Sequence, residues 1–374
     1  METDRSVFIR TDGNAQIASG HLMRCISIAN ACRKLDMEVH FLVSDKESVS
    51  LFSGKLSADF PITCLRSAVY DHLEQELPEL LALLAEHESQ KKIFLLDSYY
   101  VTEKYLTSVR TLAQTVYMDD LMLFNYPVDL LINYDVIPSR NMDFYRFAYT
   151  NAQKTLLGAA YAPLRDQFQN REMPLRNQVR NVLITTGGSD PLHFCLSFLH
   201  FLNGTAFLRD PKSGNTRDDI TFHILVGSLN TDRDALFSLA KASPFIRLYE
   251  NVTDMASLME SCDLAVSAAG TTLYELCALG IPTVSYTMAD NQLTAATAFA
   301  EADIIPCSGD IRTSMNDVLE NILLFLTQMS KSDTSNLTEA TAISYGKRKL
   351  VHKTMRSFID GNGSTKIAKA ILDL

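Results

Sequence analysis

The chain of 374 residues lacks the features that mark several common classes of protein. No apolar run approaches the ~20 residues that span a bilayer, and no apolar segment resembling a signal peptide follows Met1. We therefore expect a cytoplasmic protein that does not insert into membranes. A formal net charge of −10 provides no general attraction for nucleic acid, so no nucleic-acid partner is expected.

Cysteine pairs and metal-binding motifs are also missing. The seven cysteines stand singly, without a C-x-x-C pair, which argues against a disulfide framework and against a structural zinc site. Asp232-Arg233-Asp234 matches a motif of metal-dependent glycosyltransferases, but capping and first-turn charge at a predicted helix start explain it as well. We favour capping and expect neither a metal nor a cofactor.

The glycine pattern of dinucleotide-binding loops is absent too. Residues 7–9 are predicted to form a strand, but Asp12-Gly13-Asn14 after it has no second glycine at the required spacing, and Gly20 comes too late. An oxidoreductase is therefore a weak interpretation.

The residues that are present indicate two α/β domains. Apolar residues make up 47% of the chain and charged residues 21%, as in globular proteins, and 374 residues are more than one hydrophobic core usually holds. Short apolar runs alternate with helical stretches in both halves, which is the pattern of parallel sheets. A polar segment with a proline, 169–174, separates the halves. We predict an N-terminal domain over 1–170 and a C-terminal domain with a helical tail over 171–374.

The most informative loop follows the first predicted strand. An amphipathic helix is predicted to begin at Gly20-His21, at the edge where ligands bind in open parallel sheets. The positive end of that helix disfavours imidazolium, which favours a neutral His21 that can take up a proton. His21 is therefore the candidate base, although a polar residue at a helix start is also commonly a cap.

Polar side chains follow two further predicted strands of the first half. Asp97-Ser98-Tyr99-Tyr100 comes after the strand 92–96, and Asp119-Asp120 comes after the strand 115–117 and Met118. Both groups are expected at the ligand edge of the sheet. We interpret the aspartates as caps or loop braces more readily than as substrate contacts.

The second half carries three candidate ligand loops. Gly187-Gly188 follows a predicted strand and lets a phosphate or sugar approach the backbone. A short helix is predicted to begin at Gly270-Thr271-Thr272, where backbone N–H groups suit a diphosphate, and Glu275, one turn on, suits a ribose diol. Asn291-Gln292 follows another predicted strand.

Taken in order, these segments resemble the nucleotide-sugar hydrolase of pseudaminic acid biosynthesis. The second half also resembles the donor-binding domain of the peptidoglycan GlcNAc transferase. The first resemblance covers nearly the whole chain and rests on residues 9–13, Gly20-His21-Leu22-Met23-Arg24-Cys25, 161–165, 187–190, 289–292 and 360–363. It implies a GT-B fold, in which two Rossmann-like domains with parallel sheets face each other across a cleft.

The resemblance also implies a reaction. This is the metal-independent hydrolysis of UDP-2,4-diacetamido-2,4,6-trideoxy-β-L-altropyranose to UDP and free sugar, with His21 as the general base and Asn291 holding the water or the sugar. Ala18, where the family usually has glycine, and the insertion 203–219 depart from the pattern. The residues that the resemblance assigns to substrate or UDP binding are Asp12, Gly20, Arg24, Tyr99, Arg165, Gly187, Gly188, Gly270, Thr271, Thr272, Glu275 and Gln292.

Two other functions stay open. The same fold and UDP site would serve a glycosyltransferase if an acceptor replaced water, although the Gly-His-x-x-Arg-Cys opening favours the hydrolase. A binding or scaffold protein is disfavoured because His21, Glu275 and Asn291 are all present. The product is expected to enter a surface polysaccharide or flagellin glycosylation, and the sequence predicts no oligomeric state.

Overall fold

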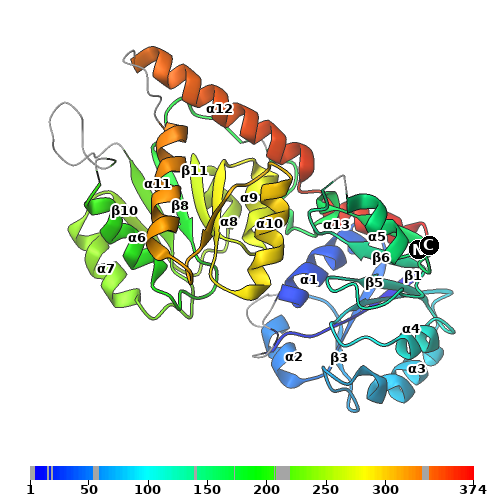
Figure 1. The fold of residues 1–374 in the computed structure, drawn as a ribbon. Helices are drawn as coiled ribbons and strands as arrows, with labels where there is room; N and C mark the ends of the chain where they lie inside the picture. Colours follow the sequence, from blue (N-terminus) through cyan, green and yellow to red (C-terminus); the bar gives the residue numbers. More distant parts are fainter. Residues whose placement is uncertain are drawn as a thin grey trace. The chain divides into compact units, whose positions relative to one another are not determined.

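The computed structural model describes residues 5–14, 17, 20–53, 59–138, 141–171, 173–205, 207, 220–330 and 337–374. The chain divides into two compact units: the first unit is Met1–Asp166 with Gly361–Leu374, and the second unit is Gln167–Asp360. Each unit is built on a parallel sheet with helices packed against it (Figure 1). The predicted α/β fold with two parallel-sheet domains is therefore confirmed.

The first unit alternates strands and helices along the chain. Its elements are β1 Arg5–Thr11, α1 Gly20–Arg33, β2 Glu38–Val43, α2 Lys46–Ser53, β3 Ile62–Cys64, η1 Leu73–Glu76, α3 Leu77–Glu86, β4 Lys91–Asp97, α4 Glu103–Val109, β5 Gln114–Met118, β6 Leu130–Asn133, α5 Met142–Ala148, β7 Lys154–Leu157, η3 Ala159–Tyr161 and α13 Gly363–Leu372, while η4 Asp166–Phe168 lies at the boundary.

The sheet of the first unit has the strand order β3-β2-β1-β4-β5-β6-β7. Its central strand β1 is buried on both faces: Val7 and Ile9 pack with α1 and α13, and Phe8 packs with α3 and α4. β1 and β4 are neighbours, and the following strands extend the sheet in opposite directions: β2 and β3 beyond β1, and β5, β6 and β7 beyond β4. In open parallel sheets the loops after two such strands flank the ligand crevice.

The end of the chain belongs to the first unit, whereas the sequence analysis placed it in the C-terminal domain. Helix α13 buries Ile367 and Ile371 against the same face as α1. Ser364 donates a hydrogen bond to the carbonyl of Leu164 at 3.0 Å. A Cβ at Gly363 would lie 2.0 Å from the carbonyl oxygen of Ala162, so only glycine permits this close approach. The domain ranges 1–170 and 171–374 are corrected accordingly.

The second unit repeats the alternation. Its elements are β8 Asn181–Thr185, α6 Phe194–Asn203, β9 Thr221–Leu225, α7 Arg233–Ala242, β10 Ile246–Tyr249, α8 Met255–Glu260, β11 Leu264–Ala268, α9 Thr272–Leu279, β12 Thr283–Thr287, η6 Asp290–Gln292, α10 Leu293–Glu301, β13 Cys307–Asp310, α11 Met315–Ser330 and α12 Leu337–Phe358.

The sheet of the second unit has the order β10-β9-β8-β11-β12-β13, so its ligand crevice is expected after β8 and β11. Val182 and Ile184 of β8 pack on one face with α6 and α11. The strand β13 was not predicted because Cys307-Ser308-Gly309-Asp310 has no β-branched or aromatic residue. It pairs with β12 at an irregular register.

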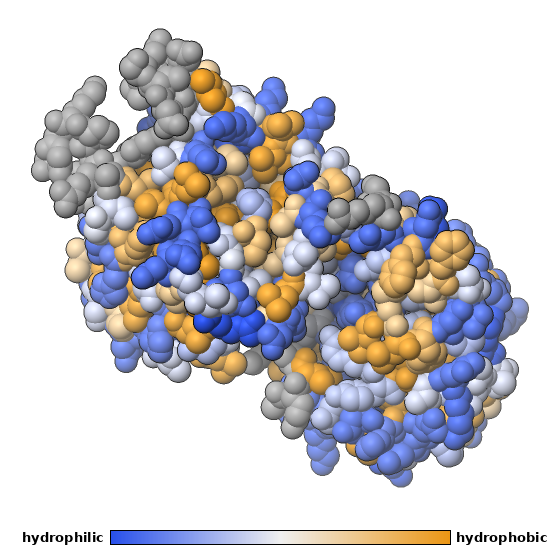
Figure 2. All heavy atoms as spheres, in the orientation of Figure 1, coloured by the Kyte–Doolittle hydropathy of each residue, from blue (hydrophilic) through white to orange (hydrophobic). Residues whose placement is uncertain are grey.

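Apolar side chains reach the surface of the first unit at α5, where Figure 2 shows apolar groups among hydrophilic ones. Phe144 and Phe147 are 65% and 76% exposed, and no residue of this helix is buried. Among the helices that the structure describes, none is long and apolar enough to cross a membrane.

Candidate functional site

Three side chains at the start of α1 converge on one buried carboxylate, that of Asp97. Nδ1 of His21 lies 2.6 Å from Oδ1, Arg24 donates from Nε to Oδ2 at 2.6 Å and from Nη2 to Oδ1 at 2.5 Å, and the Cys25 thiol donates to Oδ2 at 3.4 Å. Residues at i, i+3 and i+4 share one face of a helix. This convergence explains the spacing Gly-His-x-x-Arg-Cys.

The sheet brings the two partners together. Asp97 ends β4, where it pairs with Thr11 of β1, and α1 begins after the loop that follows β1. The loops after β1 and β4 therefore meet at the point where the strand order reverses, which is the ligand edge of an open parallel sheet. The predicted helix start at Gly20-His21 is confirmed by α1.

Asp97 selects the tautomer of His21. Burial by itself raises the pKa of Asp97, but the Arg24 guanidinium and the His21 imidazole hold it well below its usual range. Nδ1 of His21 lies 2.6 Å from the carboxylate and 3.2 Å from Nη2 of Arg24. An ionised carboxylate only accepts hydrogen bonds, so the shorter contact assigns the hydrogen of a neutral imidazole to Nδ1 and leaves the lone pair on Nε2. The imidazole is thus arranged to accept a proton at Nε2.

Arg24 is occupied within the protein. Its side chain is 11% exposed, and besides Asp97 its Nη1 contacts Asp120 at 2.8 Å and the hydroxyl of Tyr134 at 2.6 Å. These contacts make Arg24 a positioning residue that holds the Asp97 carboxylate in place. A direct contact between Arg24 and substrate stays a prediction.

A pocket opens beside His21. The ring of Tyr99, 39% exposed, stands edge-on to the imidazole with centroids 4.6 Å apart. Gly20 is exposed, and a Cβ there would meet open space. Ala18 lies outside the described residues. The pocket is lined by Asp12, Ile17, His21, Tyr70, Asp97, Ser98, Tyr99 and Tyr100.

Asp12 and Asp119 serve the scaffold. Asp12 accepts the backbone N–H of Ser44 at 2.6 Å and a hydrogen bond from the buried Arg10 at 2.5 Å, so the predicted substrate contact of Asp12 stays a prediction. Asp119 accepts hydrogen bonds from two loop N–H groups and from the hydroxyls of Tyr126 and Tyr149. Asp119 is therefore a loop brace, as expected.

Asp97, in contrast, has a role that the sequence analysis missed. It was treated like Asp119, as a cap or brace, but its partners are the side chains of His21 and Arg24. No local signal distinguishes it from Asp119, because both follow a buried strand and only the strand order places β4 next to β1. A second missed group is Asp135, whose pKa is raised to about 7 by burial and by the charges of Asp120 and Asp119.

The candidate loops of the second unit lie along one edge of its sheet. The loops after β8, β11 and β12 follow three neighbouring strands, so their carboxyl ends are side by side. Gly187 has φ of +82°, which glycine adopts without strain, and a Cβ at Gly188 or Gly270 would meet open space. Gly227 was overlooked: a Cβ there would lie 2.4 Å from the Gly188 carbonyl oxygen.

The predicted diphosphate site lies at the start of α9. Thr271 is exposed at the N-cap and its side chain makes no capping hydrogen bond, while Thr272 opens the helix. The positive end of a helix attracts anions there. Glu275 is half-buried in the first turn of α9. Diphosphate and ribose binding stay predictions.

The loop after β12 divides its polar residues between two tasks. Asn291 is exposed on η6, whereas Oε1 of Gln292 accepts the backbone N–H of Met288 at 2.9 Å and closes the turn. Arg165 is half-buried near the end of the first unit, after η3. The catalytic role of Asn291 and the ligand contacts of Gln292 and Arg165 stay predictions.

The capping interpretation of Asp232 is wrong. Asp232 stands at the N-cap of α7 but its side chain makes no capping hydrogen bond; its Oδ2 lies 2.7 Å from Nδ1 of His193 instead. Asp234 lies in the first turn, as expected. Most of the insertion 203–219 lies outside the described residues.

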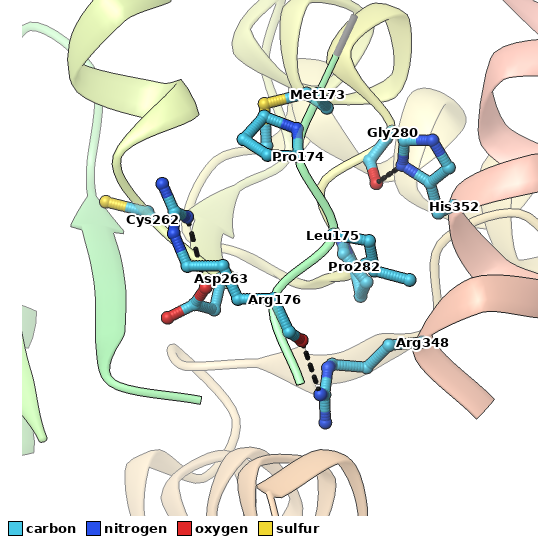
Figure 3. A pocket seen from close by; sticks show the side chains of 10 residues that line it. All are labelled: Met173, Pro174, Leu175, Arg176, Cys262, Asp263, Gly280, Pro282, Arg348 and His352. Atoms are coloured by element: carbon cyan, nitrogen blue, oxygen red, sulfur yellow. Dashed lines mark hydrogen bonds and ion pairs between the residues drawn. The ribbon is translucent and has the colours of Figure 1, made fainter. Parts of the chain in front are cut away.

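A second pocket lies at the other end of α9, around its C-cap Gly280 (Figure 3). His352 contacts the Gly280 carbonyl at 2.8 Å, and Arg348 donates to the carbonyls of Met329, Arg176 and Asn177. These polar groups fasten α12 to its neighbours. We therefore interpret this pocket as a packing joint and not as a ligand site.

Sequence comparison identifies distant relatives. The chain is 24% identical over 290 residues to the pseudaminic acid cytidylyltransferase and UDP-2,4-diacetamido-2,4,6-trideoxy-β-L-altropyranose hydrolase of Helicobacter pylori, covering 76% of this chain and 45% of that protein. It is 25% identical over 219 residues to the spore coat polysaccharide biosynthesis protein SpsG of Bacillus subtilis, covering 58% of each. An uncharacterized protein of Methanocaldococcus jannaschii is 24% identical over 294 residues, covering 74% of this chain and 54% of that protein. The chain thus spans about half the length of these curated relatives. No protein-family model matches it.

Structure comparison identifies the fold. MurG of Acinetobacter baumannii superposes with a TM-score of 0.64 at 13% identity, covering 99% of this chain and all of that one. The glycotransferase of kitacinnamycin superposes with a TM-score of 0.60 at 13% identity, covering 100% of this chain and 99% of that one. A putative UDP-N-acetylglucosamine 2-epimerase of Listeria monocytogenes gives 0.57 at 11% identity, covering 99% and 96%. The chain therefore has the GT-B type of fold.

Proposed function

We propose that this chain hydrolyses a UDP-activated diacetamido-trideoxyhexose, UDP-2,4-diacetamido-2,4,6-trideoxy-β-L-altropyranose, to UDP and the free sugar. The similarity to the Helicobacter pylori protein and to SpsG supports a role for this chain in nucleotide-sugar reactions of surface-glycan biosynthesis. The GT-B type of fold, found in enzymes that handle such donors, is consistent with this class of substrate.

The observation that carries the proposal is the pairing of His21 with Asp97 at 2.6 Å. With Nδ1–H directed at the carboxylate, Nε2 accepts a proton from water as the water oxygen attacks the anomeric carbon. The bond between that carbon and the diphosphate oxygen breaks, and its electron pair leaves with UDP. The imidazolium that forms on His21 is stabilised by Asp97, whose carboxylate stays ionised.

The leaving group needs no acid of its own. UDP departs as a stable anion, so stabilising its developing charge lowers the barrier as a proton donor would. The backbone N–H of Gly270 donates to the Ala268 carbonyl at 2.9 Å, so within Gly270-Thr271-Thr272 we assign this task to the N–H groups of Thr271 and Thr272. We assign ribose binding to Glu275. Asn291, exposed after β12, would hold the water or the sugar.

The test is UDP release in metal-free buffer without an acceptor, from the altrose derivative, from other UDP-diacetamido-trideoxy sugars and from UDP-GlcNAc. Wild type is expected to release UDP from the altrose derivative, and His21→Gln is expected to lose turnover while binding UDP as before. His352→Gln is the matched control, because Nδ1 of His352 also contacts an oxygen, the Gly280 carbonyl at 2.8 Å, outside the candidate ligand loops, and this variant is expected to keep full activity.

Two results would contradict the proposal. Tight UDP binding by wild type without turnover on any of these sugars would favour a glycosyltransferase that awaits its acceptor. A parallel loss of UDP affinity in His21→Gln would make His21 a binding or folding residue.

A further inference from the structure

A cluster of two histidines and one glutamate lies in the first unit, away from the ligand edge. Glu38 and His40 belong to β2, and His87 follows the end of α3. One potential ligand atom from each residue lies within 4.8 Å of the others. The sequence does not reveal this group, because His87 follows His40 by 47 residues and no recognisable motif links them.

The local structure explains why the three meet. Glu38 and His40 are two residues apart on a strand and therefore point to the same face of the sheet. Phe8 of the neighbouring β1 lies on that face too, stacked on His40 with centroids 5.4 Å apart and edge-on to His87 at 4.9 Å. Both imidazoles therefore pack against the apolar ring of Phe8, which restricts their orientation.

Outer contacts orient the donor atoms. Ser6 donates to Oε2 of Glu38 at 3.0 Å, which leaves Oε1 facing His40 at 2.9 Å. Nδ1 of His87 accepts the backbone N–H of Ser89 at 3.3 Å and lies 3.1 Å from the Ser89 hydroxyl. A metal on Nε2 of His87 would therefore need Nδ1 to carry the hydrogen and donate it to that hydroxyl oxygen. Carboxylates and imidazoles that bind metals are typically fixed by second contacts of this kind.

Nε2 of His40 already faces a carboxylate. It lies 2.9 Å from Oε1 of Glu38, although the contact is not aligned as a hydrogen bond. A cation bound between this nitrogen and the carboxylate would give both atoms a better-directed partner.

We propose that Glu38, His40 and His87 form a divalent transition-metal site, best suited to Zn²⁺. The two imidazoles favour zinc-like ions over Mg²⁺ and Ca²⁺, which prefer all-oxygen sites, and Zn²⁺ also accepts a carboxylate oxygen. In a tetrahedral site with bonds of ~2.1 Å, ligand atoms lie about 3.4 Å apart, so small rotations of the partly exposed Glu38 and His87 close the cluster around the ion. Water takes the fourth position.

The site lies at the opposite edge of the sheet from the candidate base. Glu38 pairs with Ser6 near the amino ends of β2 and β1, whereas Asp97 ends β4 at the carboxyl edge. The ion would tie the sheet to the end of α3 and stabilise the first unit. It takes no part in the hydrolysis that we propose, so the two proposals are tested separately.

The experiment is a Zn²⁺ titration of the chelator-stripped full chain, followed by calorimetry and thermal unfolding. Wild type is expected to bind one Zn²⁺ with a rise in Tm, and Mg²⁺ is expected to give neither effect. His87→Gln and Glu38→Gln should each weaken binding at least ~10-fold. His193→Gln, which alters a histidine–aspartate pair elsewhere, should bind like wild type.

Replacing Zn²⁺ by Co²⁺ adds a spectroscopic readout, since tetrahedral Co²⁺ with nitrogen and oxygen ligands absorbs in the visible range. The visible bands should disappear in His87→Gln. The proposal is overturned if wild type binds no Zn²⁺, if the His87 and Glu38 variants bind like wild type, or if binding is lost only on replacing the exposed Cys64 or Cys307 by serine.

Discussion

The pairing of Asp97 with His21 leads to the sharpest prediction, for the substitution Asp97→Asn. Asparagine keeps the shape of the side chain, but its amide can donate to Nδ1 of His21. That hydrogen bond stabilises the tautomer with hydrogen on Nε2, which has no lone pair left for the proton of water. A similar exchange in a histidine–aspartate pair lowers kcat by ~10⁴, so we expect a fall of ~10³–10⁴ with KM little changed.

The same substitution has a second, smaller effect on stability. Arg24 loses its charged partner Asp97 but keeps Asp120 at 2.8 Å and the Tyr134 hydroxyl at 2.6 Å. Breaking a buried ion pair completely costs about 3–5 kcal/mol, and because these contacts remain we expect a loss of about 2–3 kcal/mol. The free energy of unfolding would be measured by urea denaturation, and kcat by UDP release from saturating substrate.

Asp119→Asn is the matched control. Asp119 is as buried as Asp97, at 1% exposure, and follows the neighbouring strand β5, but its partners are loop N–H groups and two tyrosines. It should lose comparable stability while kcat stays within about threefold of wild type. The reasoning is refuted if Asp97→Asn keeps more than about a tenth of the wild-type kcat, or if both variants lose kcat equally.

Two further predictions concern the nucleotide site and the response to pH. Glu275→Ala should weaken UDP binding ~10-fold in calorimetry, the loss expected for a charged hydrogen bond to ribose, and unchanged affinity would remove this assignment. The folded-state pKa of Asp135 is about 7, above its ordinary value of 3.8, so its contribution to stability is lost as pH rises from about 4 to 7. Asp135→Asn should therefore raise the free energy of unfolding by up to about 4 kcal/mol at pH 8, and by much less at pH 4. Urea denaturation at the two pH values measures the difference. An equal effect at both would contradict the raised pKa of Asp135.

Local sequence signals were sufficient for most of the architecture. The apolar runs at β1, β2, β4 and β11 are buried strands in the structure. A strand with apolar side chains on both faces is stable in a parallel sheet because helices cover both faces of that sheet. The glycine and proline signals located the loops at the carboxyl ends of the strands. Cys307–Asp310 escaped because pairing with β12, and not its own composition, makes it a strand.

The candidate site divides in the same way. Local patterns were enough to place a histidine at the start of the first long helix, an arginine and a cysteine on the same helix face, and aspartates after two later strands. Which aspartate meets the histidine depends on the folded sheet, since Asp97 and Asp119 have equivalent positions along the chain. The difference arises from strand order: β4 lies next to β1, whereas β5 is one strand further away.

Long-range packing decided the remaining features. The last helix joins the first unit because its apolar face completes a core begun some 360 residues earlier, and no local pattern records which core accepts it. The Glu38, His40 and His87 cluster exists because the end of α3 returns to the start of β2. Hydrophobic periodicity and turn signals involve only a few consecutive residues, so a sequence alone reveals them. Which distant segments pack together depends on the folded sheet.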